Sequence, residues 1–162
     1  MDVSPLPYVE IGKLLGMLVY LEDLDGKTDV YAISDDMGLE MDELVNIIKV
    51  AELLGFVEVK EGDLYITEIG KDIVYGDENR KKTIFKRAIK KLSHFRRLVG
   101  ALKHSQDQSI PKSKVLDFLL EEMSEDEANE SLKSIIELGR YAELIGYNPE
   151  SKELYLDKVD EE

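Results

Sequence analysis

The sequence contains no cysteine among its 162 residues. The chain therefore has no disulfide framework, no thiolate ligand for a metal ion and no cysteine nucleophile. Long hydrophobic runs are also missing, because the longest, Leu14–Leu21, spans eight residues, whereas a membrane-spanning helix needs about 20. The N-terminus lacks the basic region of a signal peptide, since Asp2 and Glu10 stand there. These absences predict a cytoplasmic protein that is not inserted in a membrane.

Positive charge is scarce, because 21 lysine and arginine residues stand against 35 aspartate and glutamate residues, for a formal net charge of −14. Phosphates of nucleic acids and anionic lipids repel such a chain, which disfavours general affinity for either. With 43% hydrophobic residues, the chain can still bury the core of one ordinary domain or of two small ones.

No arrangement typical of catalysis or cofactor binding is present in the sequence. The Gly12–Gly16 segment lacks the form of a phosphate-binding loop. The turn at Asp23–Gly26 resembles a calcium loop, but Leu21 occupies the first ligand position. His94 and His104 lie ten residues apart on one expected helix, too far to share a metal ion. We expect His94 at the surface, where neighbouring cations disfavour its protonation. The sequence therefore predicts no enzyme activity, no cofactor and no metal site.

One stretch concentrates the scarce positive charge. Between Arg80 and Lys103 lie ten lysine or arginine residues and no acidic residue. Apolar residues recur there at alternating spacings of three and four, the period of one helix face. They are Phe85, Ala88, Leu92, Phe95, Val99 and Leu102. We predict one continuous helix over Asn79–Lys103. The side chains expected to be buried are Phe85, Leu92, Phe95 and Val99.

On each side of this basic helix, expected helices are followed by an expected β-hairpin. The helices span residues 9–22, 29–37, 41–54, 112–122 and 125–138. The hairpin turns lie at 60–63 and 148–151, where the apolar period changes to two. Ser124 and Glu127 predict a capping box, and Gly139 is expected to close the last helix.

This order predicts a mainly α fold with small β-hairpins, made of tandem winged-helix-like halves. The expected domains are a first half at 1–76, the central basic helix at 77–104 and a second half at 105–162. Similar strings support a repeat but leave its register open. AELLGF and AELIGY are offset by 91 residues and DLYIT and ELYLD by 90, whereas aligning Gly55 with Gly139 gives 84.

Four stretches of the chain resemble the AAA-associated C-terminal domain. They are VEIGKLLGMLVYLE at 9–22, ELLGFVEVKEGDLYITEIGK at 52–71, KKTIFKRAIKKL at 81–92 and GRYAELIGYNPESKELYL at 139–156. That domain follows the ATPase module in ABC-transporter subunits of the nitrate, sulfonate and taurine type, and it also occurs alone. The resemblance implies an accessory, regulatory or protein-contacting module of winged-helix type. Because 162 residues leave no room for the ATPase module, we expect a stand-alone chain that does not hydrolyse ATP by itself.

Two functions remain open. In the first, the chain contacts a protein partner, either an ABC-type ATPase in trans or a second copy of itself. The expected contact residues are Arg80, Lys82, Lys86, Lys90, Arg97, Tyr141 and Tyr147. In the second, it is a DNA-binding transcriptional regulator with contacts at Asn46, Lys49 and Lys60. The helix at 41–54 would read DNA, but carboxylates at its N-terminal end oppose phosphate contacts, so we favour the protein partner.

Overall fold

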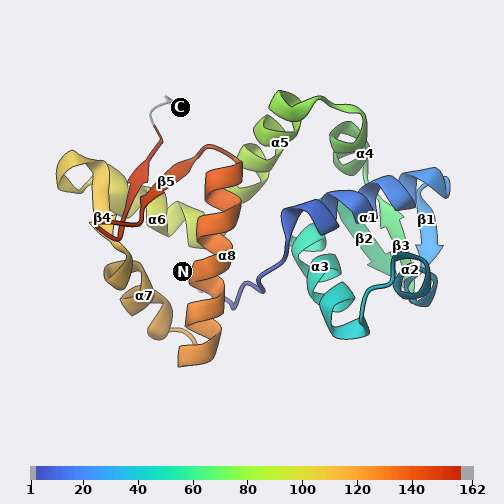
Figure 1. The fold of residues 1–162 in the computed structure, drawn as a ribbon, viewed down its shortest axis with the longest axis horizontal. Helices are drawn as coiled ribbons and strands as arrows, with labels where there is room; N and C mark the ends of the chain where they lie inside the picture. Colours follow the sequence, from blue (N-terminus) through green and yellow to red (C-terminus); the bar gives the residue numbers. More distant parts are fainter. Residues whose placement is uncertain (1–2, 158–162) are drawn as a thin grey trace. The chain divides into compact units, whose positions relative to one another are not determined.

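The computed structural model describes residues 3–157, which divide into two compact units. The N-terminal unit is Val9–Ile84, and the C-terminal unit combines the described parts of 1–8 and 85–162. The chain passes between the units twice, the second time inside helix α5 (Glu78–Lys90). Figure 1 shows the elements of both units, with labels on the helices and on most of the strands. The ends of the two halves expected from the sequence extend beyond the described residues.

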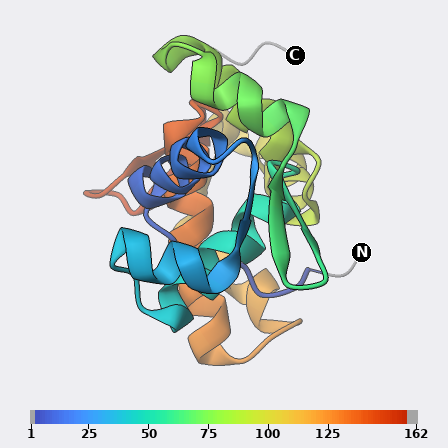
Figure 2. The ribbon, with the colours of Figure 1, turned by 90° about the vertical axis from the view of Figure 1, so that its right-hand side faces the viewer.

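The N-terminal unit contains helices and one three-stranded antiparallel sheet. Its elements are α1 (Ile11–Asp23), β1 (Lys27–Asp29), α2 (Val30–Met37), α3 (Met41–Leu53), β2 (Val57–Lys60), β3 (Asp63–Ile66) and α4 (Glu68–Tyr75). The strand order is β1-β3-β2, and the buried Leu64 of β3 pairs with Thr28 on one side and Val59 on the other. Figure 2 shows the β2–β3 hairpin leading into α4.

Local capping chemistry sets the ends of the helices in this unit. The Asp29 side chain accepts a hydrogen bond from the Tyr31 amide at the start of α2. Gly38 ends α2 in the left-handed region at φ 65°, where glycine carries no steric penalty. Thr67 caps α4 by accepting from the Gly70 amide at 3.1 Å. Each cap comes from a residue next to the helix end, so contacts that are local in the sequence set where these helices begin and end.

The C-terminal unit repeats the order of elements that the N-terminal unit has from α1 to β3. Its elements are α6 (Ser93–Lys103), β4 (Ser109–Pro111), α7 (Lys112–Leu120), α8 (Glu125–Tyr141), β5 (Ile145–Asn148) and β6 (Glu153–Leu156), with a 3-10 turn at Gln106–Gln108 before β4. The strand order β4-β6-β5 corresponds to β1-β3-β2, and both sheets are antiparallel. This mainly helical fold with two small sheets confirms the predicted fold class.

The ends of α3 and α8 fix the register of the repeat. The residue after the C-cap is left-handed in both, with Gly55 at φ 82° and Glu143 at φ 57°. In each case the amide of the next residue, Phe56 or Leu144, donates to the carbonyl five positions earlier at 2.9 Å. Gly55 and Glu143 are thus equivalent positions of the repeat, 88 residues apart. The loop of the second hairpin is longer than that of the first, so the equivalent strands β3 and β6 are 90 residues apart. The string match at offset 91 was therefore misleading.

Gly139 lies inside α8 and does not close it, contrary to the prediction from sequence. The residue is buried, and a Cβ atom there would lie 2.4 Å from Ile145 Cγ1 and 3.3 Å from Phe95 Cε1. Close packing of the hairpin against α8 therefore explains the glycine. A helix-ending glycine and a close-packing glycine look alike in sequence, since both follow an apolar helical stripe.

We expect Gly139→Ala to lower the free energy of unfolding by about 1–3 kcal/mol, the usual cost of overpacking. The matched control is Gly100→Ala in α6, where nothing lies within 4 Å of an added Cβ. That change should raise stability by about 0.5–1 kcal/mol, because alanine is the better helix former. Urea unfolding of both variants measures the difference. Equal effects of the two substitutions would contradict the packing role of Gly139.

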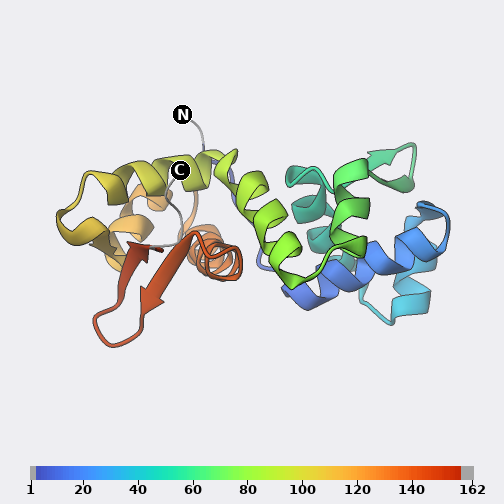
Figure 3. The same cartoon turned by 90° about the horizontal axis from the view of Figure 1, so that it is seen from above.

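The predicted continuous helix over Asn79–Lys103 is wrong. Helix α5 ends at Lys90 and α6 begins at Ser93, with extended backbone at Leu92 (φ −76°, ψ 141°). Figure 3 shows the resulting bend between the two helices. The periodicity could not reveal it, because a stripe with 3.6-residue spacing looks the same on one helix or on two helices that meet at a bend.

The break also changes which side chains are buried. Phe85 and Phe95 are fully buried, as predicted. Leu92 and Val99 are only half-buried, and the fully buried residue in this part of α6 is Leu98. After the break, Phe95 and Leu102 of the stripe are fully buried, whereas Leu98 takes the buried position expected for Val99.

Residues 3–8, here called the strap, dock on the C-terminal unit. Leu6 is 1% exposed, and its amide donates to Ser131 Oγ at 2.8 Å. Ser134 Oγ donates to the Pro7 carbonyl at 2.9 Å. His94 Nε2–H donates to the Ser4 carbonyl at 2.5 Å. Side chains of α6 and α8 thus satisfy the backbone of the strap, much as a neighbouring strand would.

The prediction of a surface position for His94 is wrong, because the residue is 3% exposed. Burial lowers the pKa of His94 from its ordinary 6.5, and the hydrogen bond to Ser4 opposes this shift only in part. Its Nδ1 atom is buried with no hydrogen-bond partner among the described residues. A proton added at Nδ1 would therefore find no acceptor.

We expect the free energy of unfolding to fall as the pH drops below about 6.5, because the unfolded chain then takes up a proton that buried His94 resists. Above that pH, His94 is neutral in both states and makes no contribution of this kind. The matched variant His94→Gln retains an N–H donor for Ser4 but does not titrate. Denaturant unfolding between pH 7.5 and 5 should therefore show a steeper loss for the wild type, and parallel curves would contradict this explanation.

Candidate interaction surfaces

The exposed face of α3 is the first candidate surface, since Asn46 and Lys49 of the DNA hypothesis lie on this helix. Lys49 is exposed, whereas Asn46 is half-buried. The exposed face also carries Val45, which is 50% exposed, and Leu53, which is 42% exposed. Glu52 is exposed as well. With Asp42, which is also exposed, the face combines one cation, two carboxylates and two apolar side chains.

The N-terminal end of α3 is acidic. Asp42 and Glu43 lie in its first turn, after Glu40 at the N-cap. Lys13 of α1 contacts Glu43, with 2.5 Å between Nζ and Oε2. This hydrogen bond raises the pKa of Lys13 above its ordinary value. Lys13 offsets part of the negative charge there, and Asp42 remains exposed at the end of the helix that a DNA-binding protein would insert into the groove.

Lys60, the third residue of the DNA hypothesis, lies at the end of β2. Its ammonium group is 3.3 Å from Glu58 and 5.8 Å from the ring centroid of Tyr65. Lys27 lies over the same ring at 5.4 Å. An exposed ion pair of this kind contributes about 0–1 kcal/mol to stability, so it does not hold the Lys60 side chain in one conformation.

The basic residues expected to contact a partner do not form one line, because α5 and α6 meet at a bend. Arg80 is exposed and lies 3.9 Å from Asp72. Arg97 donates to Glu121 at 2.9 Å and stacks over Phe118 at 4.5 Å from the ring centroid. Arg97 is half-buried, and so are Lys82, Lys86 and Lys90. Carboxylates of the same chain therefore face part of this surface.

The two tyrosines of the expected contact set belong to different elements. Tyr141 is the last residue of α8 and lies outside the β5–β6 hairpin. Its ring meets Phe85 edge to face, with centroids 5.0 Å apart and 75° between the planes. Tyr147 lies in β5 with Lys112 Nζ 5.8 Å from its ring centroid. Both are half-buried, and whether either contacts a partner stays a prediction.

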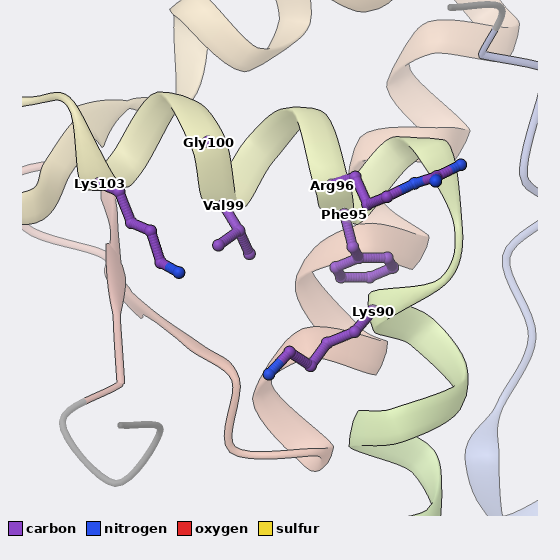
Figure 4. A pocket seen from close by; sticks show the side chains of 6 residues that line it. All are labelled: Lys90, Phe95, Arg96, Val99, Gly100 and Lys103. Atoms are coloured by element: carbon purple, nitrogen blue, oxygen red, sulfur yellow. The ribbon is translucent and has the colours of Figure 1, made fainter. Parts of the chain in front are cut away.

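The C-terminal unit has a hollow that the sequence did not predict. Its volume is about 260 Å³, and we call it the α6 hollow. It is lined by Lys90, Phe95, Arg96, Val99, Gly100 and Lys103. Figure 4 shows Lys90 and Lys103 extending toward the same space beside Val99 and Phe95, while Arg96 extends away from Lys103. The available signal was Gly100, a helix-interior glycine that the apolar stripe does not explain.

The chain thus consists of two small α+β units that share the order helix, strand, two helices and hairpin. Both positive and negative side chains are exposed on them. The family model described as the C-terminal AAA-associated domain matches residues 31–148. The chain belongs to this family, and the resemblance noted in the sequence is confirmed. No curated protein and no solved structure matches the chain with significant similarity. Within residues 3–157, no helix is both long enough and apolar enough to cross a membrane.

Proposed function

We propose that the chain is a non-catalytic accessory module of winged-helix type that acts by contacting a protein, an ABC-type ATPase in trans. Membership of the AAA-associated domain family supports an accessory role beside an ATPase. The order helix, short strand, two helices and hairpin, present in both units, supports the winged-helix assignment.

The exposed face of α3 is the single observation that carries the proposal. In a winged-helix protein that reads DNA, this helix would present donors to base edges and cations to phosphates. Here it presents Val45 and Leu53 beside Glu52, with Lys49 as the exposed cation. Apolar side chains within a rim of mixed charge are the composition of a protein interface.

The basic residues of α5 and α6, taken one by one, fit the same proposal. Arg80 and Arg97 already contact carboxylates of this chain across exposed pairs. Such pairs contribute little to stability, so a partner's carboxylates can replace the internal ones at small cost. The exchange would orient the partner and speed its association, as complementary charges do at other interfaces.

Affinity capture from native lysate tests the proposal. We expect the tagged chain to retain an ABC-type ATPase subunit. The double variant Val45→Asp/Leu53→Asp should lose that subunit by about tenfold or more, a difference of about 1.4 kcal/mol. Lys114→Glu, at an exposed position of α7, serves as the matched control and should retain it. Recovery of no ATPase, or equal recovery by the double variant, would contradict the proposal.

A further inference from the structure

The site on α8 that receives the strap is built to hold an extended backbone. Three polar side chains are buried in the described part of the chain, and all three bind the strap. They are His94, Ser131 and Ser134. At the edge of the site, Glu130 accepts from the Tyr8 amide at 3.0 Å, and Lys133 Nζ lies 4.0 Å from the Tyr8 ring centroid. Positions 130, 131, 133 and 134 of α8 thus contact one extended segment.

The repeat relates this site to the outer face of α3. With the offset of 88 residues, α3 and α8 end at equivalent residues, Leu53 and Tyr141. Their buried apolar positions also coincide. The pairs are Leu44 and Leu132, Ile47 and Ile135, and Val50 and Leu138. The strap-binding positions of α8 therefore correspond to four neighbouring residues of α3. These are Asp42, Glu43, Val45 and Asn46.

The corresponding positions of α3 are accessible. Val45 is 50% exposed and Asp42 is exposed, whereas Ser131 and Ser134 are buried under the strap. At the other end of the helix, the exposed Leu53 corresponds to Tyr141, whose ring packs against Phe85 of α5. Segments of the chain itself thus contact α8 at positions whose counterparts on α3 are exposed.

The polar side chains of the α3 face can bind a backbone as the serines of α8 do. Glu43 stands in place of Ser131 and can accept from a backbone amide. Its Oε2 already bonds Lys13 Nζ at 2.5 Å, but a carboxylate accepts several hydrogen bonds. Asn46 stands in place of Ser134 and can donate to a backbone carbonyl. Such bonds to the main chain are how proteins hold extended peptides.

The remaining side chains indicate the composition of the segment that fits. Val45 stands in place of Lys133, so an apolar contact replaces a cation there. Glu40 and Asp42 are both exposed and make the N-terminal end of α3 negative. Lysine or arginine residues of the segment would complement this charge. The strap of a second copy does not fit, because residues 3–8 contain no basic residue.

We propose that the α3 face binds an extended segment of the ATPase partner, with an apolar residue against Val45 and lysine or arginine residues beside Asp42. The segment lies across α3 as the strap lies across α8. This inference rests on the proposed function and names the element of the partner that the face receives.

Two synthetic peptides, acetyl-SPLPYKK-amide and acetyl-SPLPYEE-amide, test the proposal on the full chain. Both contain the strap sequence 4–8 and differ only in charge. We expect the basic peptide to shift the amide NMR signals of residues 42–46 in a saturable way, with a dissociation constant of about 1 mM or tighter. The acidic peptide should bind about tenfold more weakly or worse. Equal binding of both peptides, or no saturable shift on α3, would overturn the proposal.

Two variants at exposed positions locate the binding. Val45→Asp should weaken the basic peptide by about tenfold or more, and Asp42→Lys should narrow the preference between the peptides to about threefold or less. Lys114→Glu, on α7, is the matched control and should change neither affinity. Unchanged peptide affinities in Val45→Asp and Asp42→Lys would overturn the assignment. Shifts of the α3 signals on raising the protein concentration alone would identify a second copy as the occupant and would also overturn it.

The peptide titration and the lysate capture fail separately. Capture of an ATPase that depends on Val45 and Leu53, without binding of the basic peptide, would contradict this inference and leave the proposed function standing. Peptide binding to α3 without capture of an ATPase would contradict the proposed function.

Discussion

Replacement of Phe95 by alanine is expected to lower the free energy of unfolding by about 3–5 kcal/mol, the range for removing a large side chain from a packed core. Phe95 is fully buried in α6, and its ring lies beside Gly139 of α8. No small shift of one helix can refill that volume, because the residue at the contact has no side chain. Equilibrium urea unfolding, with an unchanged slope against denaturant, measures the loss.

Val99→Ala is the internal control for this prediction. The uninterrupted stripe places Val99 in the core with Phe95, whereas the structure leaves Val99 half-buried after the break at Leu92. Its truncation should therefore cost about 1 kcal/mol or less, the lower part of the range for single substitutions. A loss for Val99→Ala as large as that for Phe95→Ala would favour the continuous helix, and a small loss for both would place the stripe outside the core.

The second large effect is expected at Leu6, in the strap. Leu6→Ala should lower the free energy of unfolding by about 2–5 kcal/mol, because the leucine is 1% exposed in the core of the C-terminal unit. The loss should appear as faster hydrogen exchange in α8, which Leu6 contacts through the hydroxyl group of Ser131. A loss of this size in the free energy of unfolding is expected only if Leu6 and the strap are buried in the C-terminal unit.

Ser4→Ala is the matched control in the strap. The Ser4 side chain is exposed, and its backbone carbonyl, which accepts from His94, is kept in the variant. This change should stay within about 0.5 kcal/mol. If Leu6→Ala behaved like Ser4→Ala, or if exchange quickened only in α3, the strap would not belong to the core of the C-terminal unit.

The features predicted correctly are those whose cause is local in the sequence. Ser124 and Glu127 form the expected capping box at the start of α8, because each side chain reaches only its own first turn. Gly38 ends α2 in the left-handed region, and both hairpins lie where the apolar period changes to two. The order of elements in the two units follows from these signals, and so does the fold class.

The features that were missed depend on contacts between distant segments. Strands β1 and β4 have three residues each, too few for a period to be read, and they exist because β3 and β6 pair with them. His94 is buried by the strap, which lies 90 residues away in the chain. The α6 hollow needs the bend at Leu92 and the missing side chain of Gly100 together, and neither alone indicates a cavity.

The sequence shows how charge is distributed along the chain, but it does not show which single charged residues contact one another. Lys60 and Arg97 each contact a carboxylate of the same chain, and a composition count cannot anticipate such pairs. Arg96 and Lys103 were counted only as part of the basic helix, although they line the α6 hollow. The charge of each residue is known from its type, whereas the direction in which its side chain extends is known only from the structure.

The central proposal is that this chain contacts a protein and does not read DNA, and a fluorescence anisotropy titration of labelled duplex DNA tests it most directly. We expect no saturable binding of random or upstream duplex at micromolar protein near physiological salt, because carboxylates dominate the N-terminal end of α3. Lys49→Glu and Lys60→Glu should therefore change nothing in this titration. Sub-micromolar, sequence-dependent binding that weakens steeply with salt and is lost in Lys49→Glu would contradict the claim and identify a DNA-binding regulator.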